Sequence, residues 1–466
     1  MPNSSHLNRR MFLKRLALLG TSASLLATQD RFQLISSAAA ATSDYSNLSD
    51  HKSLVCIFLN GGNDGFNTLI PYEPDQYQNY QTSRASLAIP RSELTPLKGG
   101  QQAFHPSLSD LSNLYDTDKL AVVANVGSLI QPISKFEFQQ GSAPLPSALF
   151  SHSHQQSFWQ TARQPEGGIL PTGWGGRMAD LLHSSNVQAN TPLSYSLSGS
   201  NFWLGADTTS SFSMNSAGIK EFNHFQDINW PAWNKSRFQA FSGIQSLDYS
   251  DSLLKRQMNN VYDQARGRID ILGEAYRNAP EITTVYPKKN NLASSLKAIA
   301  QMISIREELG LKRQFFFVSL GGWDTHNDQL DKHSAQLSTL NDAMKAFYET
   351  TVELGVSNSV TTFTASEFGR TYGPNREGTD HAWSSHNFVM GGAVDGGKIH
   401  GQLPSFELGG IDDSSSSGTG RFIPQYSVDQ YAGTLGKWMG ISDSDNREIL
   451  TNLNNFSTVD LGFMKA

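Results

Sequence analysis

Cysteine is almost missing from this chain of 466 residues, which contains only Cys56. A single thiol cannot form an intramolecular disulfide, so the class of small disulfide-stabilised domains is excluded. Cys56 lies within the continuous apolar run 54–59, where we expect a buried strand residue without a bonding partner. The stability of the fold must therefore come from its core, to which a bound metal would add.

An excess of one charge and long apolar runs are also missing. The 36 basic and 42 acidic residues are interspersed and give a net charge of −6, so no basic surface points to nucleic acid. No apolar run reaches the roughly 20 residues that a membrane-spanning helix needs. A dinucleotide fingerprint and a cysteine cluster are absent as well, which disfavours a redox role. We expect no nucleic-acid partner and no stable membrane anchor.

The N-terminus has the three parts of a twin-arginine signal peptide in their usual order. Arg9 and Arg10 come before a moderately apolar, uncharged run at 16–27, and the small residues at 36–41 offer A-x-A cleavage sites. A short amphipathic helix with a chance arginine pair would explain only the first of these parts.

Residues 1–41 are therefore expected to be a signal that sends the folded protein through the twin-arginine translocase. The predicted destination is the periplasm or the cell exterior. Residues 42–466 are expected to form the mature domain.

Four short runs have the composition of strands. Three are continuously apolar, which is typical of strands buried on both faces of a parallel sheet, and the fourth is β-branched and aromatic. In chain order, these runs are residues 54–59, 120–126, 314–320 and 359–365. Apolar residues recur with helical spacing at 292–303 and 337–347, so strands and helices alternate. This alternation predicts an α/β sheet with right-handed crossovers.

Two further segments differ from this alternation. Between about 185 and 285, serine, asparagine and aromatic residues occur with little periodicity, which predicts an insertion or cap over the sheet. The helical pattern returns at 427–438, so we expect a helix near the end of the chain.

Carboxylates follow three of the predicted strands. Asp64 comes after the first strand, Asp324 after the third and Glu367 after the fourth, and two of these segments begin with a Gly-Gly pair that permits close approach of the backbone. In an open α/β sheet, ligands gather beyond the carboxyl ends of the strands. Carboxylates gathered there would raise each other's pKa, and a bound divalent cation would relieve the repulsion.

Histidines near these carboxylates complete a candidate metal site. The candidate ligands are Asp64, Asp324, His326, Glu367, Asp380 and His381, with His386 as a further imidazole. Carboxylate and imidazole together suit zinc, manganese or magnesium, and calcium is favoured if the histidines are not ligands.

Each candidate also has a simpler interpretation. Asp64 lies in a Gly-Gly-Asn-Asp-Gly stretch where it could serve only the turn. Glu367 and Arg370 could form an ion pair without a metal. His326 and His381 each follow an aspartate closely, and either could be a structural histidine.

Five blocks of the sequence resemble one known family. They are GGNDGFNT (61–68), GWDTH (322–326), SEFGRT (366–371), GTDH (378–381) and SVDQY (427–431). Together they resemble a twin-arginine-exported family of unknown function (domain of unknown function fifteen-oh-one), which is grouped by similarity with the alkaline phosphatase and sulfatase superfamily. The resemblance implies an alkaline-phosphatase-like three-layer sandwich with a mostly parallel central sheet and an irregular insertion.

The resemblance also implies roles for the candidate ligands. Asp64 resembles the superfamily aspartate after the first strand, Asp324 with His326 resembles a second-metal pair, and Asp380 with His381 resembles the final ligand position. Where the superfamily has an Asp-His pair after the next strand, this chain has Glu367-Phe368, which removes an imidazole.

A nucleophile and an anion-binding group are implied in the same way. Superfamily enzymes use a Ser, Thr or modified Cys at a helix N-terminus, and Ser151 or Ser153 resembles it. These hydroxyls could instead be helix caps. Cys56 is inside a strand and is no candidate. Arg177 and Arg370 are the residues that could hold an anionic substrate bidentately.

Two functions from different classes follow. The first is an exported metal-dependent hydrolase of phosphate or sulfate esters, with a small anionic ester as substrate. The second is an exported binding or assembly protein that keeps the hydrolase fold without its chemistry. The Glu367-Phe368 departure favours the second, whose contact surface would be the aromatic-rich segment between about 200 and 240.

Overall fold

The computed structural model describes residues 43–164, 172–186, 191–219, 232–246 and 252–465. By its internal contacts the chain divides into two units, Met1–Asp44 and Tyr45–Ala466, and all elements named below belong to the second. The predicted twin-arginine signal, residues 1–41, lies outside the described residues. Among the helices of the described ranges, none combines the length and apolar character needed to cross a membrane.

A nine-stranded sheet forms the centre of the second unit. Its order is β11-β5-β10-β9-β1-β8-β6-β7, and β12 also pairs with β5. The strands span Lys52–Leu59 (β1), Leu120–Gly127 (β5), Ser194–Ser196 (β6), Phe212–Ser213 (β7), Arg313–Leu320 (β8), Val360–Ala365 (β9), Ser385–Met390 (β10), Ile399–His400 (β11) and Tyr426–Ser427 (β12). Only β10 pairs antiparallel with its neighbours, β5 and β9. The sheet is therefore mostly parallel.

The four predicted strands are confirmed as β1, β5, β8 and β9. The whole of β5 is buried, and β1 is buried from Ser53 to its end. This double-sided burial explains their continuous apolar composition. Cys56 lies within β1 as a buried free thiol, as predicted.

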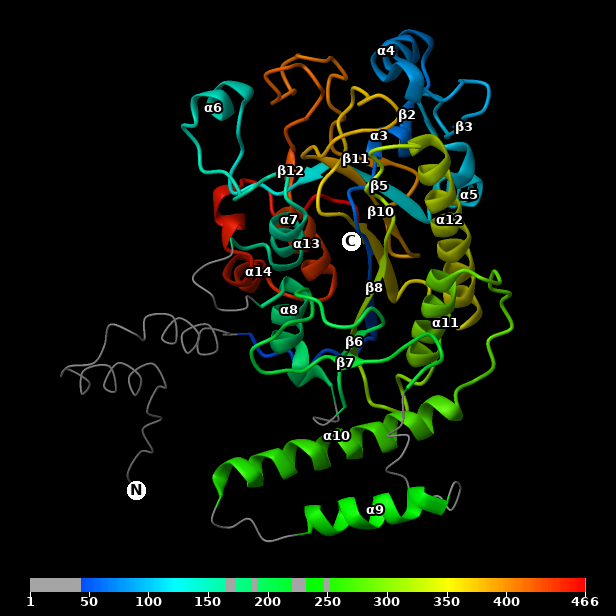
Figure 1. Ribbon diagram of the computed structural model, residues 1–466, viewed down its shortest axis with the longest axis vertical. Coiled ribbons are helices and arrows are strands. Elements are labelled where there is room, and N and C mark those ends of the chain that lie inside the picture. The colour runs from blue at the N-terminus through cyan, green and yellow to red at the C-terminus, as the bar shows by residue number, and fades with distance from the viewer. Residues whose placement is uncertain (1–42, 165–171, 187–190, 220–231, 247–251, 466) are drawn as a thin grey trace, which may run out of the picture. The chain divides into compact units, whose positions relative to one another are not determined.

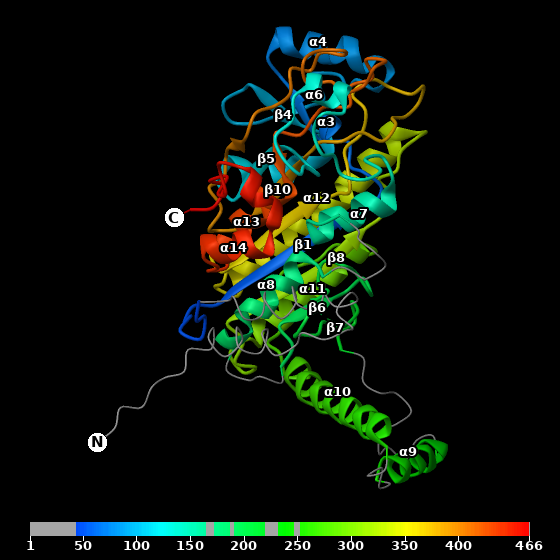
Figure 2. The ribbon, with the colours of Figure 1, turned by 90° about the vertical axis from the view of Figure 1, so that its left-hand side faces the viewer.

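Helices cover both faces of the sheet, and Figures 1 and 2 show the three layers. One layer contains α7 (His152–Thr161), α8 (Trp174–Leu182), α13 (Val428–Trp438) and α14 (Asp443–Ile449). The other contains α5 (Ser109–Asp116), α11 (Asn291–Ser304) and α12 (Gln329–Glu353). The predicted helices at 292–303, 337–347 and 427–438 correspond to α11, the middle of α12, and α13. The mixed α/β fold with a sheet between two helical layers is thus confirmed.

A smaller sheet stands beside the helix α3 (Gly65–Thr68). It has the order β2-β4-β3, with strands Leu69–Pro71 (β2), Gln102–Phe104 (β4) and Thr95–Pro96 (β3). Along the chain, these three strands lie between β1 and β5. The helix α4 (Pro74–Arg84) follows β2, and its last residue, Arg84, is fully buried. The helix α6 (Lys135–Gln140) follows β5.

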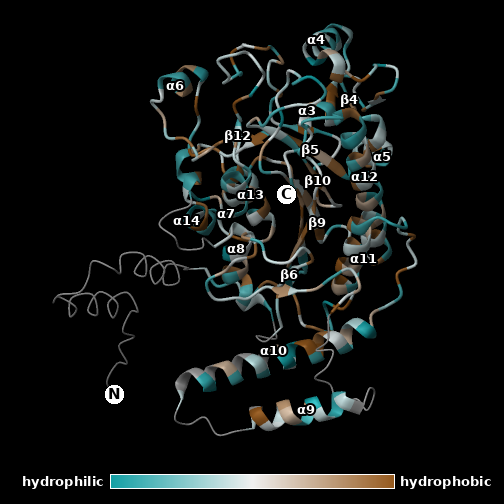
Figure 3. Cartoon of the chain, in the orientation of Figure 1, coloured by the Kyte–Doolittle hydropathy of each residue, from teal (hydrophilic) through white to brown (hydrophobic). Residues whose placement is uncertain are grey.

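The segment between about 185 and 285 contains β6, β7 and two helices, α9 (Ala232–Gln245) and α10 (Leu253–Arg277). Figure 3 shows apolar residues gathered in the strands of the main sheet, whereas apolar and polar residues alternate along α9 and α10. β6 pairs in parallel with β8, so part of this segment belongs to the main sheet. That the segment is an insertion stays a prediction.

The carboxyl ends of β9, β1 and β8 meet at one edge of the sheet. β1 lies between the other two strands, parallel to both, and Leu59 pairs with Leu320 at the end of β8. Gly61 follows β1 with φ +124°, and a Cβ atom on it would lie 2.3 Å from the backbone nitrogen of Asp324. Glycine at this position lets the loop after β1 contact the loop after β8.

Substituting Gly61→Ala should therefore destabilise the protein and move the Asp324 loop. The left-handed backbone alone costs about 1–3 kcal/mol for a non-glycine residue, and the clash with Asp324 adds to this. Chemical denaturation would measure the loss. Gly321→Ala is the matched control, because a Cβ there meets no atom within 4 Å. Equal stabilities of the two variants would contradict this account of the loop.

Candidate functional site

Asp324 is the centre of a cluster of histidines at this sheet edge. Its Oδ2 lies 3.5 Å from Nε2 of His152, and its Oδ1 lies 3.2 Å from Nε2 of His381. A third imidazole, that of His326, places Nε2 3.0 Å from Oδ1. The Asp324 side chain is 43% exposed, so the cluster is open to solvent.

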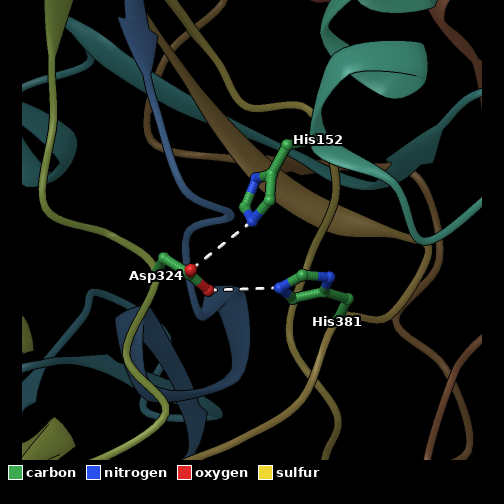
Figure 4. Close-up of side chains that lie close together, drawn as sticks. All are labelled: His152, Asp324 and His381. Atoms are coloured by element: carbon green, nitrogen blue, oxygen red, sulfur yellow. Dashed lines mark hydrogen bonds and ion pairs between the residues drawn. The ribbon is translucent and has the colours of Figure 1, made fainter.

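Three elements far apart in the sequence supply the core of this cluster. His152 is the first residue of α7, Asp324 follows β8, and His381 lies in the loop before β10. Figure 4 shows both imidazoles pointing at the carboxylate. One donor atom from each of the three residues lies within 4.8 Å of the other two, close enough to share one metal ion.

The outward ring nitrogen of each imidazole faces an oxygen. Nδ1 of His152 lies 2.8 Å from Oε1 of Glu367, and Nδ1 of His381 lies 2.8 Å from the backbone oxygen of Phe150. Nδ1 of His326 lies 3.5 Å from Oδ1 of Asp380. Where the oxygen accepts the Nδ1 proton, as Glu367 can from His152 and Phe150 from His381, the Nε2 atom of the neutral ring carries a lone pair. This is how metal-binding histidines are usually oriented.

Glu367 orients the imidazole of His152 through its contact with Nδ1. The glutamate is buried, and its Oε1 also accepts hydrogen bonds from the backbone N–H of Gly61 at 2.8 Å and from Nε2 of Gln156 at 3.1 Å. Its Oε2 is buried and has no hydrogen-bond partner among the described residues. Glu367 therefore contacts the Nδ1 side of the His152 imidazole through Oε1, and its Oε2 makes no hydrogen bond among the described residues.

Arg370 holds Asp324 from the other side. Its guanidinium is buried; Nη1 donates to Oδ1 of Asp324 at 2.7 Å and to the backbone oxygen of Gly61 at 3.3 Å. Nε and Nη2 donate to the hydroxyl and the backbone oxygen of Thr379. With these donors engaged, Arg370 orients Asp324 and anchors the surrounding loops.

The electrostatics of the cluster favour a charged aspartate. Partial burial raises the pKa of Asp324, but the hydrogen bond and charge of Arg370, together with His326 and His381, outweigh this and hold the pKa below its ordinary value. The hydrogen bond to Glu367 raises the pKa of His152. Burial lowers the pKa of His381, and the charges of Arg370 and His152 act in the same direction.

These residues fit a divalent cation. The Nε2 atoms of His326 and His381 lie 3.2 Å apart, and both approach Oδ1 of Asp324, at 3.0 and 3.2 Å. Such an arrangement needs a proton or a cation between or beside the two atoms. Imidazole nitrogens with a carboxylate suit zinc or manganese better than calcium, which prefers oxygen ligands.

Asp64 lies outside this cluster. It is fully buried, and its Oδ1 caps α3 by accepting from the backbone N–H groups of Phe66 and Asn67. Its Oδ2 accepts from Arg84 and Gln329. Burial raises the pKa of Asp64, but the charge of Arg84 outweighs burial and keeps the pKa below its ordinary value. Both oxygens are therefore engaged by protein donors.

The two candidate nucleophiles lie at the N-terminus of α7. Ser151 is the N-cap residue, yet its side chain makes no capping hydrogen bond. Its Oγ lies 3.3 Å from Oγ of Ser153 and 3.2 Å from Nδ1 of His154. Ser151 is adjacent in sequence to His152 of the cluster.

Arg177 and His386 lie elsewhere. Arg177 is buried in α8 and donates to three backbone oxygens, those of Thr161, Thr172 and Ile449. Burial lowers its pKa to about 9. His386 is buried in β10, where its Nδ1 accepts from the backbone N–H of Asn125. Among the described residues, neither side chain makes a hydrogen bond or ion pair with the cluster.

The structure adds His152, which the strand-end pattern did not indicate as a ligand. It lies on α7, whose position is set by the helical layer and not by a strand end. The available signal was the density of histidine in His152-Ser153-His154 directly after Ser151. In the sequence, this run suggested only Ser151 and Ser153 as nucleophiles, and its histidines were not considered as ligands.

Residues 51–418 match the sequence model of a family described as "Protein of unknown function (DUF1501)". The chain belongs to the DUF1501 family. This is the family that the five sequence blocks resemble. No curated protein matches the chain.

Several solved structures resemble this DUF1501 protein at very low identity. The sulfatase PsFucS1 from Pseudoalteromonas sp. is 9% identical, with 93% of this chain and 77% of that chain covered and a TM-score of 0.38. A protein of the alkaline phosphatase superfamily from Vibrio parahaemolyticus is 9% identical, with 89% and 76% covered and a TM-score of 0.33. The lipoteichoic acid synthase LtaP from Listeria monocytogenes is 8% identical, with 90% and 81% covered and a TM-score of 0.34.

Replacing Asp64 with alanine should lower the free energy of unfolding by about 3–5 kcal/mol, because it leaves the Arg84 guanidinium buried without its partner. Denaturant unfolding monitored by circular dichroism would measure this. Asp331→Ala is the control, since Asp331 is exposed in the first turn of α12 and makes no side-chain hydrogen bond or ion pair among the described residues. A stability of Asp64→Ala equal to that of the control would contradict the structural role assigned to Asp64.

Proposed function

We propose that this protein is an exported metal-dependent hydrolase of phosphate or sulfate esters. The observation that carries the proposal is the convergence of His152, Asp324 and His381, each supported by a hydrogen-bonding partner. A structural ion pair would not need two imidazoles whose Nε2 atoms approach the same carboxylate.

His152, Asp324 and His381 would hold the ion, and His326 borders them. A divalent ion bound there would act as a Lewis acid toward an ester oxygen and stabilise developing negative charge. The N-terminus of α7 begins at His152, beside the cluster. Backbone N–H groups at a helix N-terminus bind anions, so this end of α7 would orient the phosphate or sulfate group of a small anionic ester.

Ser151 is the proposed nucleophile. Nδ1 of His154 lies 3.2 Å from its Oγ and can accept the hydroxyl proton as the oxygen attacks phosphorus or sulfur. The bond from Ser151 Oγ to phosphorus or sulfur forms as the bond to the ester oxygen breaks, and the alcohol leaves with the proton that His154 accepted. Water then cleaves the Ser151 ester, which releases phosphate or sulfate and restores the Ser151 hydroxyl. Ser153 Oγ lies 3.5 Å from the same nitrogen and is the second candidate for this step.

The proposed cellular place follows from the N-terminal sequence. Arg9 and Arg10, the apolar run and the small-residue stretch support export through the twin-arginine translocase to the periplasm or beyond. That route carries folded proteins, which suits a site assembled from distant segments.

One observation favours the alternative, a non-catalytic exported binding or assembly protein that retains the fold. The Ser151 hydroxyl contacts Ser153 and His154, and among the described residues it makes no hydrogen bond to the Asp324 cluster. In that case the metal site would stabilise a binding surface.

Metal titration tests the site itself. The wild-type protein, stripped of metal with a chelator, should take up Zn²⁺ or Co²⁺. His152→Ala or His381→Ala should weaken binding by more than the roughly 10–100-fold typical of a lost outer partner, because each removes a ligand itself. Isothermal titration calorimetry gives the affinities. His400→Ala is the matched control, because His400 bonds to the backbone oxygen of Asp395. Equal affinities of all four proteins would refute the assigned ligands.

Turnover of aryl phosphates and aryl sulfates tests the chemistry. With the preferred metal bound, Ser151→Ala should reduce kcat by about 100-fold or more through loss of the nucleophile. Ser142→Ala, at an exposed serine after α6, is the control. Undiminished kcat in Ser151→Ala would exclude Ser151. No turnover by wild type with any metal, despite metal binding, would favour the binding protein.

A further inference from the structure

Asp64 is joined to the cluster by a continuous series of buried hydrogen bonds. The first is the bond from Nε2 of Gln329 to Oδ2 of Asp64, the oxygen that also pairs with Arg84. Asp64 and Gln329 are completely buried. Because a carboxylate can only accept, it determines which end of the Gln329 amide faces it.

The next bond connects Gln329 with Thr379. The hydroxyl of Thr379 donates to Oε1 of Gln329 at 2.6 Å. The Thr379 oxygen in turn accepts from Nε of Arg370 at 3.2 Å. Thr379 is also fully buried, so no water competes for its hydroxyl.

The last bond reaches the cluster. Nη1 of Arg370 donates to Oδ1 of Asp324 at 2.7 Å, and Nη2 donates to the backbone oxygen of Thr379. The planar guanidinium is thus held on three sides, and its orientation determines where the Asp324 carboxylate lies.

The series has one self-consistent direction. The Asp64 carboxylate makes Gln329 present its amide nitrogen to it, so the amide oxygen faces Thr379. The Thr379 hydroxyl therefore donates to Gln329 and keeps a lone pair for Arg370. Reversing any one bond would leave two donors or two acceptors in contact inside the protein, which is costly.

We propose that Gln329 and Thr379 are positioning residues of the metal cluster, and that Asp64 acts on the cluster from a distance by fixing the direction of this hydrogen-bond series. The inference rests on the proposed metal-dependent function. It gives Asp64 a role in the site although its oxygens are not available to an ion.

Thr379→Val is the decisive variant, because it preserves shape and removes the hydroxyl. It should weaken Co²⁺ binding by about 10–100-fold, the effect typical of lost outer partners of metal ligands. Its visible spectrum with Co²⁺ should also change, since the Asp324 ligand is displaced. Thr379→Ser keeps the hydroxyl and should restore both the affinity and the spectrum. Gln329→Met breaks the neighbouring bond and should weaken binding in the same direction.

Thr361→Val is the matched control. Thr361 is a fully buried residue near the start of β9, at the opposite end of the strand from the cluster, and its hydroxyl has no hydrogen-bond partner among the described residues. Its Co²⁺ affinity and spectrum should match wild type. Equal weakening in Thr379→Val and Thr379→Ser, or wild-type binding in Thr379→Val, would overturn the proposal.

Crystal structures of metal-free wild type and Thr379→Val separate this inference from the proposed function. The inference predicts that the Arg370 guanidinium and the Asp324 carboxylate reorient in the variant. Unchanged orientations would overturn it. If wild type takes up no Co²⁺, the proposed function fails, and these two structures alone decide whether Thr379 positions Asp324.

Discussion

The hydrogen bond between Arg370 and Asp324, 2.7 Å long, is the interaction on which the rest of the site depends. Arg370 is buried, so its charge needs a close anionic partner, and Asp324 provides one at the solvent boundary. The same guanidinium binds the backbone oxygens of Gly61 and Thr379. The Arg370 guanidinium thereby joins the loops after β1 and β8 to the loop between β9 and β10, and it holds the Asp324 carboxylate beside the histidines.

This constraint explains why the strand-end pattern in the sequence was informative. Continuous apolar runs identified β1 and β8, and a β-branched and aromatic run identified β9. Parallel strands that are neighbours in a sheet end at the same edge. Asp324 and Glu367 could therefore be placed near each other from the sequence alone. The Gly61-Gly62 pair also pointed to close approach of the backbone, and a Cβ on Gly62 would lie 2.6 Å from the ring of Phe368.

The sequence could not show which side chains contact each of the carboxylates at the strand ends. Asp64 also follows a strand, but Arg84, at the end of α4, reaches it through the packing of the smaller sheet and engages its carboxylate. His152 belongs to a helical layer, and its distance from Asp324 depends on how α7 packs against the sheet. Such contacts depend on tertiary packing, which spacing and periodicity do not encode. The sequence placed Glu367 at the carboxyl end of β9, but its contact with His152 depends on how α7 packs against the sheet.

Metal content tests the central claim most directly. The full-length protein should be purified without chelators, and its metals measured by elemental analysis alongside those of the double variant His152→Ala/His381→Ala. The account predicts about one equivalent of zinc or manganese in the wild type and its loss in the double variant. A wild-type protein that carries no divalent metal, and takes up none when it is supplied, would contradict the account.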